Sequence, residues 1–192
     1  MTDKVEVLQH VLKKLKSDNH SAAMRALEKY YPFKPQLRVK RSWTQLQSLK
    51  LFVRDGFIDR YSGDRLLFPG ALKAIALLLP EQFPFHRNWK MDESHIAFWE
   101  LFPTVDHIEP IARGGKDDEE NWATTSMLRN QAKAQWTLDE LGWVFHPVGN
   151  LKEWDGLMQL TLELAKQTPT LIEDNYFRKW LNTAKKISAN TY

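Results

Sequence analysis

The chain has 192 residues, of which 43% are hydrophobic and 12% aromatic, including 8 Trp. A chain of this composition can bury a core, and its aromatic content excludes the composition typical of disordered proteins. The formal net charge of +3 permits nucleic-acid binding without requiring it. Because the chain has no cysteine, it can form neither a disulfide framework nor a cysteine-based zinc site.

The first residues are charged and lack the apolar stretch of a secretory signal. The longest apolar run, residues 74–79, is too short to span a bilayer. We therefore expect a soluble, cytoplasmic protein with no membrane partner.

Apolar residues at helical spacing predict a helix over residues 3–16, with Asp3 and Glu6 as a capping box. A second helix is predicted over residues 21–31, ending at Pro32. The apolar stripes of these helices are expected to face a core.

Residues 36–41 alternate apolar and basic side chains, as in a short strand or an extended arm. Ser42 with Gln45 then forms a second capping-box pattern, which predicts a helix that runs to about Arg54 and ends at Gly56.

Four further elements follow along the chain. Ser62-Gly63 predicts a turn, and Pro69-Gly70 leads into a very apolar helix over residues 71–79. Residues 95–101 are expected to form one or two helical turns, and roughly the last 40 residues show helical stripes.

The most informative segment begins at Asp106-His107. It has Asn121 at 14 residues after the histidine and Asn130 at 23 residues after it, with Gly114-Gly115 between them. Residues 102–111 are predicted to be extended, 112–120 to form a loop with a positive-φ turn at the glycines, and 121–125 to form a returning strand. Ser126 then caps a helix that carries Asn130. The order is strand, loop, strand, helix.

This pattern resembles the HNH (ββα-metal) nuclease motif, in a variant with Asn at the third position. The resemblance covers about 30 residues. It implies that His107 is the general base, that Asp106 and Asn130 are the metal ligands, and that Asn121 holds the loop and orients His107. Many such nucleases carry a zinc-binding cysteine turn upstream. In this chain the matching turn, residues 61–65, has no cysteine, so no structural zinc is expected, and Trp122, Trp136 and Trp143 are candidates to brace the motif by packing.

A carboxylate with an amide oxygen is a hard, all-oxygen ligand pair, which suits Mg²⁺ or Mn²⁺ better than Zn²⁺. Because strand residues alternate in direction, Asp106 and His107 should have different roles unless the strand distorts. A histidine with an ordinary pKa is suited to accept a proton near neutral pH.

Several basic residues are candidate contacts to nucleic acid. Residues 34–65 carry an excess of positive charge and interleaved aromatic side chains, which favours a DNA-facing surface. The acidic loop tip, residues 117–120, is expected to point away from DNA. The candidates are Arg38, Lys40, Arg41, Arg113, Arg129 and Lys133.

The predicted fold class is α+β and mostly helical, with a ββα-metal core at about 102–136 wrapped by N- and C-terminal helices. The predicted segments are 1–55 (helical), 56–148 (HNH nuclease) and 149–192 (helical). The expected activity is hydrolysis of double-stranded DNA by a metal-dependent endonuclease, in restriction, phage defence or DNA processing. A homodimer would explain double-strand breaks, although nothing in the sequence establishes one. The alternatives are a DNA-binding protein with an inactive site and a nuclease for RNA or structured junctions.

Overall fold

The computed structural model describes residues 3–33 and 43–191. The chain divides into two compact units, Met1–Arg38 and Val39–Tyr192, here called the N-terminal and C-terminal units. The predicted segments 1–55, 56–148 and 149–192 have two boundaries, whereas the two units have a single boundary between residues 38 and 39. It places the helix that precedes the strands, and the C-terminal helices, in the same unit as the strands.

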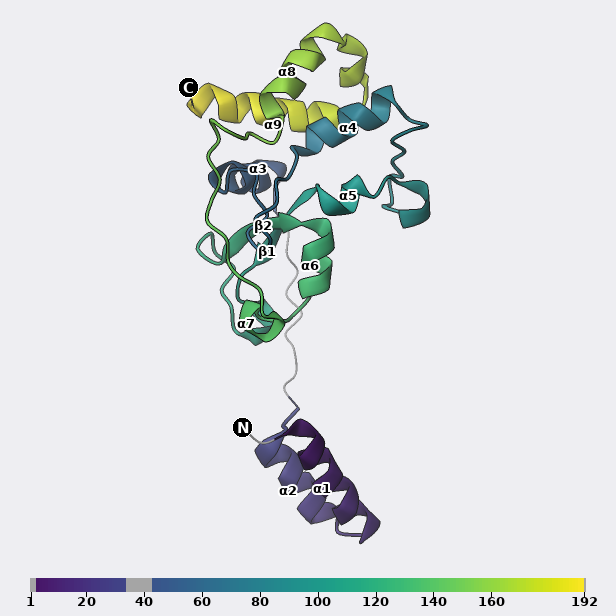
Figure 1. Cartoon of the computed structure of the whole chain (residues 1–192), viewed down its shortest axis with the longest axis vertical. Coiled ribbons are helices and arrows are strands. Elements are labelled where there is room, and N and C mark those ends of the chain that lie inside the picture. Colours follow the sequence, from purple (N-terminus) through teal and green to yellow (C-terminus); the bar gives the residue numbers. More distant parts are fainter. Residues whose placement is uncertain (1–2, 34–42, 192) are drawn as a thin grey trace. The chain divides into compact units, whose positions relative to one another are not determined.

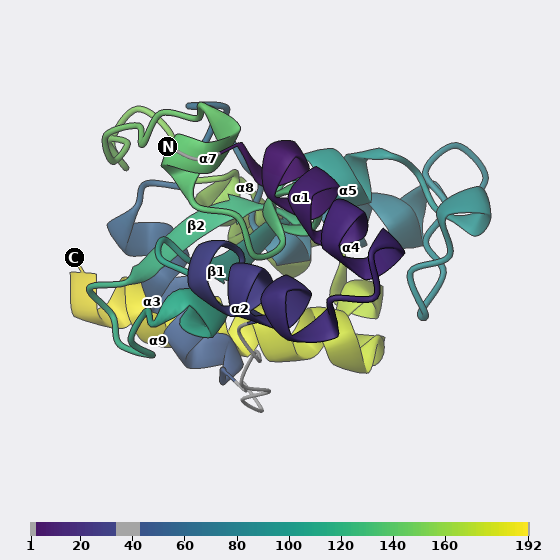
Figure 2. The same ribbon diagram turned by 90° about the horizontal axis from the view of Figure 1, so that it is seen from below.

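The N-terminal unit is a hairpin of two helices, α1 (Lys4–Lys16) and α2 (His20–Tyr30), which lie side by side in Figure 1 and Figure 2. The side chain of Asp3 accepts a hydrogen bond from the backbone of Val5 and so caps α1. Both helices confirm the prediction to within a residue at each end. The expectation that their apolar stripes are core faces is wrong for α1, because much of its stripe is exposed.

The first helix of the C-terminal unit is α3 (Gln45–Arg54). Its N-cap is Thr44, which forms a capping box with Gln47, so the predicted start at Ser42 is wrong by two residues. Gly56 has a φ of +67°, in agreement with the predicted helix end. The predicted arm at residues 36–41 lies outside the described residues.

Further along the chain lie two antiparallel strands, β1 (Pro103–His107) and β2 (Trp122–Ser126), with His107 opposite Trp122. The first strand ends at His107, earlier than predicted, because the chain turns at Pro110 into the short 3-10 helix η2 (Ile111–Arg113). Helix α6 (Met127–Lys133) starts directly after β2, and the Ser126 hydroxyl caps it as predicted. Both α3 and α6 pack against both strands.

The remaining helices complete the C-terminal unit, and α9 packs against α3, α4 and α8. The predicted mostly helical fold class with a small sheet is confirmed. Within residues 3–33 and 43–191, no helix is both long and apolar enough to cross a membrane. The remaining elements are α4 (Pro69–Leu78), η1 (Met91–Glu93), α5 (Ala97–Glu100), α7 (Leu138–Leu141), α8 (Met158–Gln167), η3 (Pro169–Glu173) and α9 (Asn175–Thr191).

The buried carboxylates of Asp55 and Asp59 join the turn after α3 to β2 through hydrogen bonds. Asp55 accepts a hydrogen bond from the backbone of Thr124 at 2.8 Å, and Asp59 accepts one from the backbone of Ser126 at 2.8 Å. Both aspartates have at most 1% of their surface exposed. Charge-assisted hydrogen bonds of this kind are stronger than neutral ones. Since no cysteine is present, these carboxylates, together with packing, hold the turn to the strands.

The three tryptophans expected to brace the strands differ in burial. Trp122 is buried in the main core, and Trp143 lies partly buried beside Tyr61. Trp136 is 48% exposed, so its expected bracing role is wrong.

Candidate active site

Asp106 and His107 are consecutive residues of β1 and therefore project to opposite faces of the sheet. On one face, Asp106 contacts Lys133 of α6. On the other face, the ring of His107 lies beside that of Trp43, with 5.6 Å between the ring centroids. Each side chain belongs to a hydrogen-bond network of its own, so the two residues can carry out different chemical roles.

The carboxylate of Asp106 is held at one oxygen. Its Oδ2 accepts a hydrogen bond from the Tyr61 hydroxyl at 2.8 Å and forms an ion pair with Lys133 Nζ at 2.8 Å. Lys133 Nζ also donates to the backbone oxygen of His107 at 2.7 Å. Burial, and then the charge of Asp106 and its hydrogen bond, raise the pKa of Tyr61 far above its ordinary value, so its hydroxyl remains a donor. From the described residues, no hydrogen bond reaches Asp106 Oδ1.

Asn130 lies on α6 and reaches the same face of β1. Its Nδ2 donates to Thr104 Oγ1 at 2.9 Å and to the backbone oxygen of Val105 at 3.3 Å. These two bonds fix the amide, and no hydrogen bond from a described residue reaches its oxygen, as is the case for Oδ1 of Asp106. The structure thus brings the two predicted ligands to one side of the strand.

The donor set at this face fits a hard divalent ion. In the part of the chain that the structure describes, one oxygen each of Asp106 and Asn130 accepts no hydrogen bond, and each residue is held at its other polar atom, as metal ligands usually are. In residues 3–33 and 43–191, no three His, Asp or Glu side chains converge on a possible metal position. A metal held here would therefore have few protein ligands and would keep positions for water or phosphate oxygens.

The ring of His107 is oriented by Asp117, a residue of the loop between the strands. His107 Nε2 lies 2.8 Å from Asp117 Oδ1, which also accepts a hydrogen bond from Trp122 Nε1 at 3.0 Å. An ionised carboxylate only accepts, so the proton of a neutral His107 is on Nε2 and the lone pair on Nδ1. The Nδ1 atom is buried and has no hydrogen-bond partner in the part of the chain described.

Sequence reasoning missed Asp117. Asp117 belongs to the acidic tip at residues 117–120, for which the sequence predicted only an orientation away from DNA, and it contacts His107. The sequence signal for such a contact is the presence of acidic residues in the loop at residues 112–120. Their spacing does not indicate which of them turns towards His107.

Asn121 holds the loop through both ends of its amide. Its Nδ2 donates to the backbone oxygens of Glu109 and Lys116 at 2.9 and 2.7 Å, and its Oδ1 accepts from the backbone of Glu109 at 2.9 Å. Gly115 lies so close to the Glu109 carbonyl that a Cβ there would clash. No hydrogen bond joins Asn121 to His107 among the described residues, so Asn121 acts on the loop and Asp117 on the ring.

Two of the arginines expected to contact nucleic acid lie at the surface with carboxylate neighbours. Arg113 is 3.4 Å from Glu140, with its side chain 40% exposed. Arg129 lies 3.9 Å from Asp59 and 3.7 Å from Asp64, with its side chain 37% exposed. All three contacts are long for ion pairs, so a phosphate could replace them at modest cost.

Lys133 has no solvent exposure, so a phosphate contact would require it to leave Asp106. The positive charge available for DNA on the surface predicted over residues 34–65 is also smaller than expected, because Arg54 and Arg60 form ion pairs with Asp55. Arg38, Lys40 and Arg41 lie outside the described residues.

Residues 95–125 match the family model of the HNH endonuclease. The match includes Asp106, His107 and Asn121 and ends before Asn130. It indicates a nuclease-type function for this segment, as the sequence pattern does. No curated protein and no solved structure matches the chain.

Proposed function

We propose that this protein is a divalent-metal-dependent endonuclease that hydrolyses phosphodiester bonds of double-stranded DNA. The observation that carries the proposal is the arrangement at the end of β1. There, among the described residues, no hydrogen bond reaches one carboxylate oxygen of Asp106, and one buried ring nitrogen of the next residue, His107, has no partner. Both lie in the segment that matches the nuclease family.

His107 is the proposed general base. Asp117 holds Nε2 and thereby fixes the tautomer in which Nδ1 can accept a proton from the attacking water. A buried polar atom without a partner costs free energy unless water or a ligand satisfies it, so the Nδ1 atom has the character of a site for that water. The carboxylate of Asp117 also stabilises the imidazolium that forms.

Asp106 and Asn130 are the proposed metal ligands, with Mg²⁺ or Mn²⁺ as the ion. When bound, the ion supplies positive charge for the phosphate and the leaving oxygen. Tyr61 and Lys133 hold Asp106 in place, and Asn121 keeps the loop that carries Asp117 closed.

Arg113 and Arg129 are proposed to bind phosphate groups of the substrate once their long carboxylate contacts are exchanged. Lys133 is better assigned to Asp106 than to DNA. The products would be 5′-phosphate and 3′-hydroxyl ends, as the resemblance implies. Restriction, phage defence and DNA processing are the proposed settings for such an activity.

The test is nicking of supercoiled plasmid by purified full-length protein with Mg²⁺ or Mn²⁺, compared with a chelator control. His107→Ala is expected to lower the rate by at least about 100-fold, because general base catalysis is typically worth that much. His86→Ala is the matched control, since His86 lies in another loop and contacts Glu93. Equal rates for His107→Ala and the parent would overturn the proposal, and faster cleavage of a matched RNA would change its substrate.

A further inference from the structure

The N-terminal unit has an apolar face that its own two helices do not cover. On α1 the exposed apolar residues recur at alternating steps of three and four, the spacing of positions a and d in a heptad. Their exposed fractions are 72%, 43%, 65% and 38%. They are Val5, Leu8, Leu12 and Leu15.

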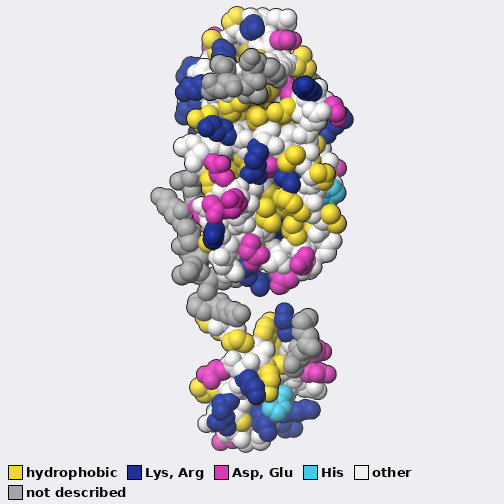
Figure 3. Space-filling view, turned by 90° about the vertical axis from the view of Figure 1, so that its left-hand side faces the viewer, with side chains coloured by type: hydrophobic (Ala, Val, Ile, Leu, Met, Phe, Trp, Pro, Cys, Tyr) yellow, Lys and Arg dark blue, Asp and Glu magenta, His cyan; other side chains and the backbone are white. Residues whose placement is uncertain are grey.

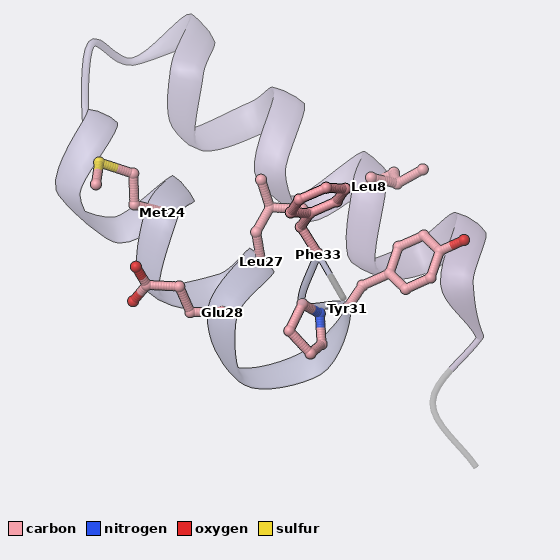
Figure 4. Close-up of a pocket in the computed structure, with 7 residues that line it drawn as sticks. Leu8, Met24, Leu27, Glu28, Tyr31 and Phe33 are labelled. Carbon is pink, nitrogen blue, oxygen red and sulfur yellow. The ribbon is translucent and has the colours of Figure 1, made fainter. Parts of the chain in front are cut away.

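Helix α2 continues this face with the same spacing. Met24 is 60% exposed, Leu27 is partly buried and Tyr31, just after the helix, is 43% exposed. With Leu8 and Phe33 they line an open hollow of about 800 Å³ on the hairpin (Figure 4). Figure 3 shows hydrophobic side chains at the surface of this unit. The hairpin thus presents two apolar stripes, one from each helix.

The contact between the two helices is too small to stabilise the hairpin alone. Its fully buried apolar residues are Val7, Val11, Ala23 and Ala26, and all four are small. Two short helices with such an interface are marginal in water, because helices of this length depend on tertiary packing. The hairpin therefore needs a further apolar surface to cover its stripes.

The area of the exposed face matches the need of a stable dimer. At roughly 200 Å² for a fully exposed large side chain, the exposed parts of the two stripes and Phe33 add up to on the order of 800 Å². A standard interface buries about 800 Å² on each partner.

We propose that this face binds the same face of a second copy of the chain, so that two hairpins form a four-helix bundle. A face made of two parallel stripes fits a partner with two helices, and the chain itself supplies a hairpin of equal length and identical spacing. A two-fold axis closes such an arrangement without leaving an apolar face open.

The charges around the face agree with this pairing. Glu28 of α2 lines the hollow, whereas Lys4 and Lys16 of α1 flank the other stripe. Two copies that place α1 of one beside α2 of the other bring opposite charges together. Self-association does not depend on the proposed function. If the protein is a nuclease as proposed, a dimer would bring together two active sites that can cut both strands of a duplex.

The first test is the molar mass of the full-length protein by light scattering over a dilution series. The parent is expected to be a dimer at micromolar concentration. Leu12→Glu, which puts a charge on the stripe, should raise the dissociation constant at least about tenfold. His10→Glu adds the same charge on the exposed opposite side of α1 and should leave the mass unchanged. A parent that is monomeric at roughly 100 μM overturns the proposal.

The second test uses the absence of cysteine. Met24→Cys places a single thiol on the face, and a short bifunctional maleimide should link two such chains. His10→Cys, whose thiol lies on the opposite side of α1, should not be cross-linked under the same treatment. If Met24→Cys is protected from a monofunctional maleimide in a monomeric protein, the face is covered within one chain and the proposal is wrong. Plasmid nicking by each variant shows separately whether the nuclease activity is present.

Discussion

The ammonium of Lys133 lies 2.8 Å from a carboxylate oxygen of Asp106, and the lysine side chain has no solvent exposure. Lys133 is one turn beyond Asn130 on α6, so the same helix that supplies the proposed second ligand also supplies a cation for the first. A buried ion pair is costly to break on one side, because the remaining charge is left without a partner. Lys133 is therefore a structural partner of the site.

Replacing Lys133 by Met should destabilise the protein by about 3 kcal/mol, because Asp106 would stay buried without its cation. Urea unfolding followed by tryptophan fluorescence measures this change. Lys152→Met, at an exposed position, is the control and should change stability by less than about 0.5 kcal/mol. Equal stability of both variants would show that the pair contributes nothing.

Tyr61→Phe removes the hydroxyl that donates a hydrogen bond to Asp106 while it keeps the ring. If Asp106 is a metal ligand, loss of this donor should weaken Mn²⁺ binding by about 10-fold or more, as loss of outer hydrogen bonds to ligands usually does. Electron paramagnetic resonance of free Mn²⁺ measures the affinity without substrate. Tyr30→Phe, in the N-terminal unit, should bind as the parent does. Unchanged affinity in Tyr61→Phe would contradict the assignment of Asp106.

Asp117→Asn should lower kcat by about 100-fold with little change in KM, because an amide no longer selects the tautomer with the lone pair on Nδ1. Glu119→Gln, an exposed neighbour in the same loop, is the control. Single-turnover cleavage of a labelled duplex separates chemistry from binding. A rise in KM alone would mean that Asp117 affects substrate binding and does not position the base.

The order of strand, strand and helix could be predicted because its signals are local. Pro110 and the glycine pair interrupt the strands, and Ser126 stands at the helix start. The start of α3 shows where local signals compete. Ser42 with Gln45 and Thr44 with Gln47 both have capping-box spacing, and the folded chain uses the second.

The contacts within the candidate site could not be predicted, because they join residues far apart in the chain. Tyr61 reaches Asp106 only because the turn after α3 lies along β2. Asp117 reaches His107 only because Asn121 closes the loop between them. The motif indicated the candidate site residues, whereas the hydrogen bonds that support them depend on tertiary packing.

The buried carboxylate of Asp59 links the turn after α3 to β2. Asp59→Ala should destabilise the protein by about 3 kcal/mol, since it leaves the backbone of Ser126 and the hydroxyl of Thr125 without their buried acceptor. Thermal unfolding by circular dichroism measures the loss. Asp64→Ala lies in the same turn at an exposed position and should have little effect. A similar melting temperature for the Asp59 and Asp64 variants would mean that packing alone holds the turn.

Stability should fall in alkaline solution through Tyr176. Burial, with a smaller contribution from Asp174, raises the pKa of Tyr176 to about 12 from an ordinary value of 10.0. The folded state therefore retains a proton that the unfolded state loses, so the stabilisation is complete below pH 10 and is lost as the pH rises towards 12. For one proton the slope is at most about 1.4 kcal/mol per pH unit. Urea unfolding at several pH values should show a shallower decline for Tyr176→Phe than for the parent, whereas Tyr30→Phe, an exposed tyrosine, should follow the parent. Parallel declines for the parent and Tyr176→Phe would show that ionisation of Tyr176 is not coupled to unfolding.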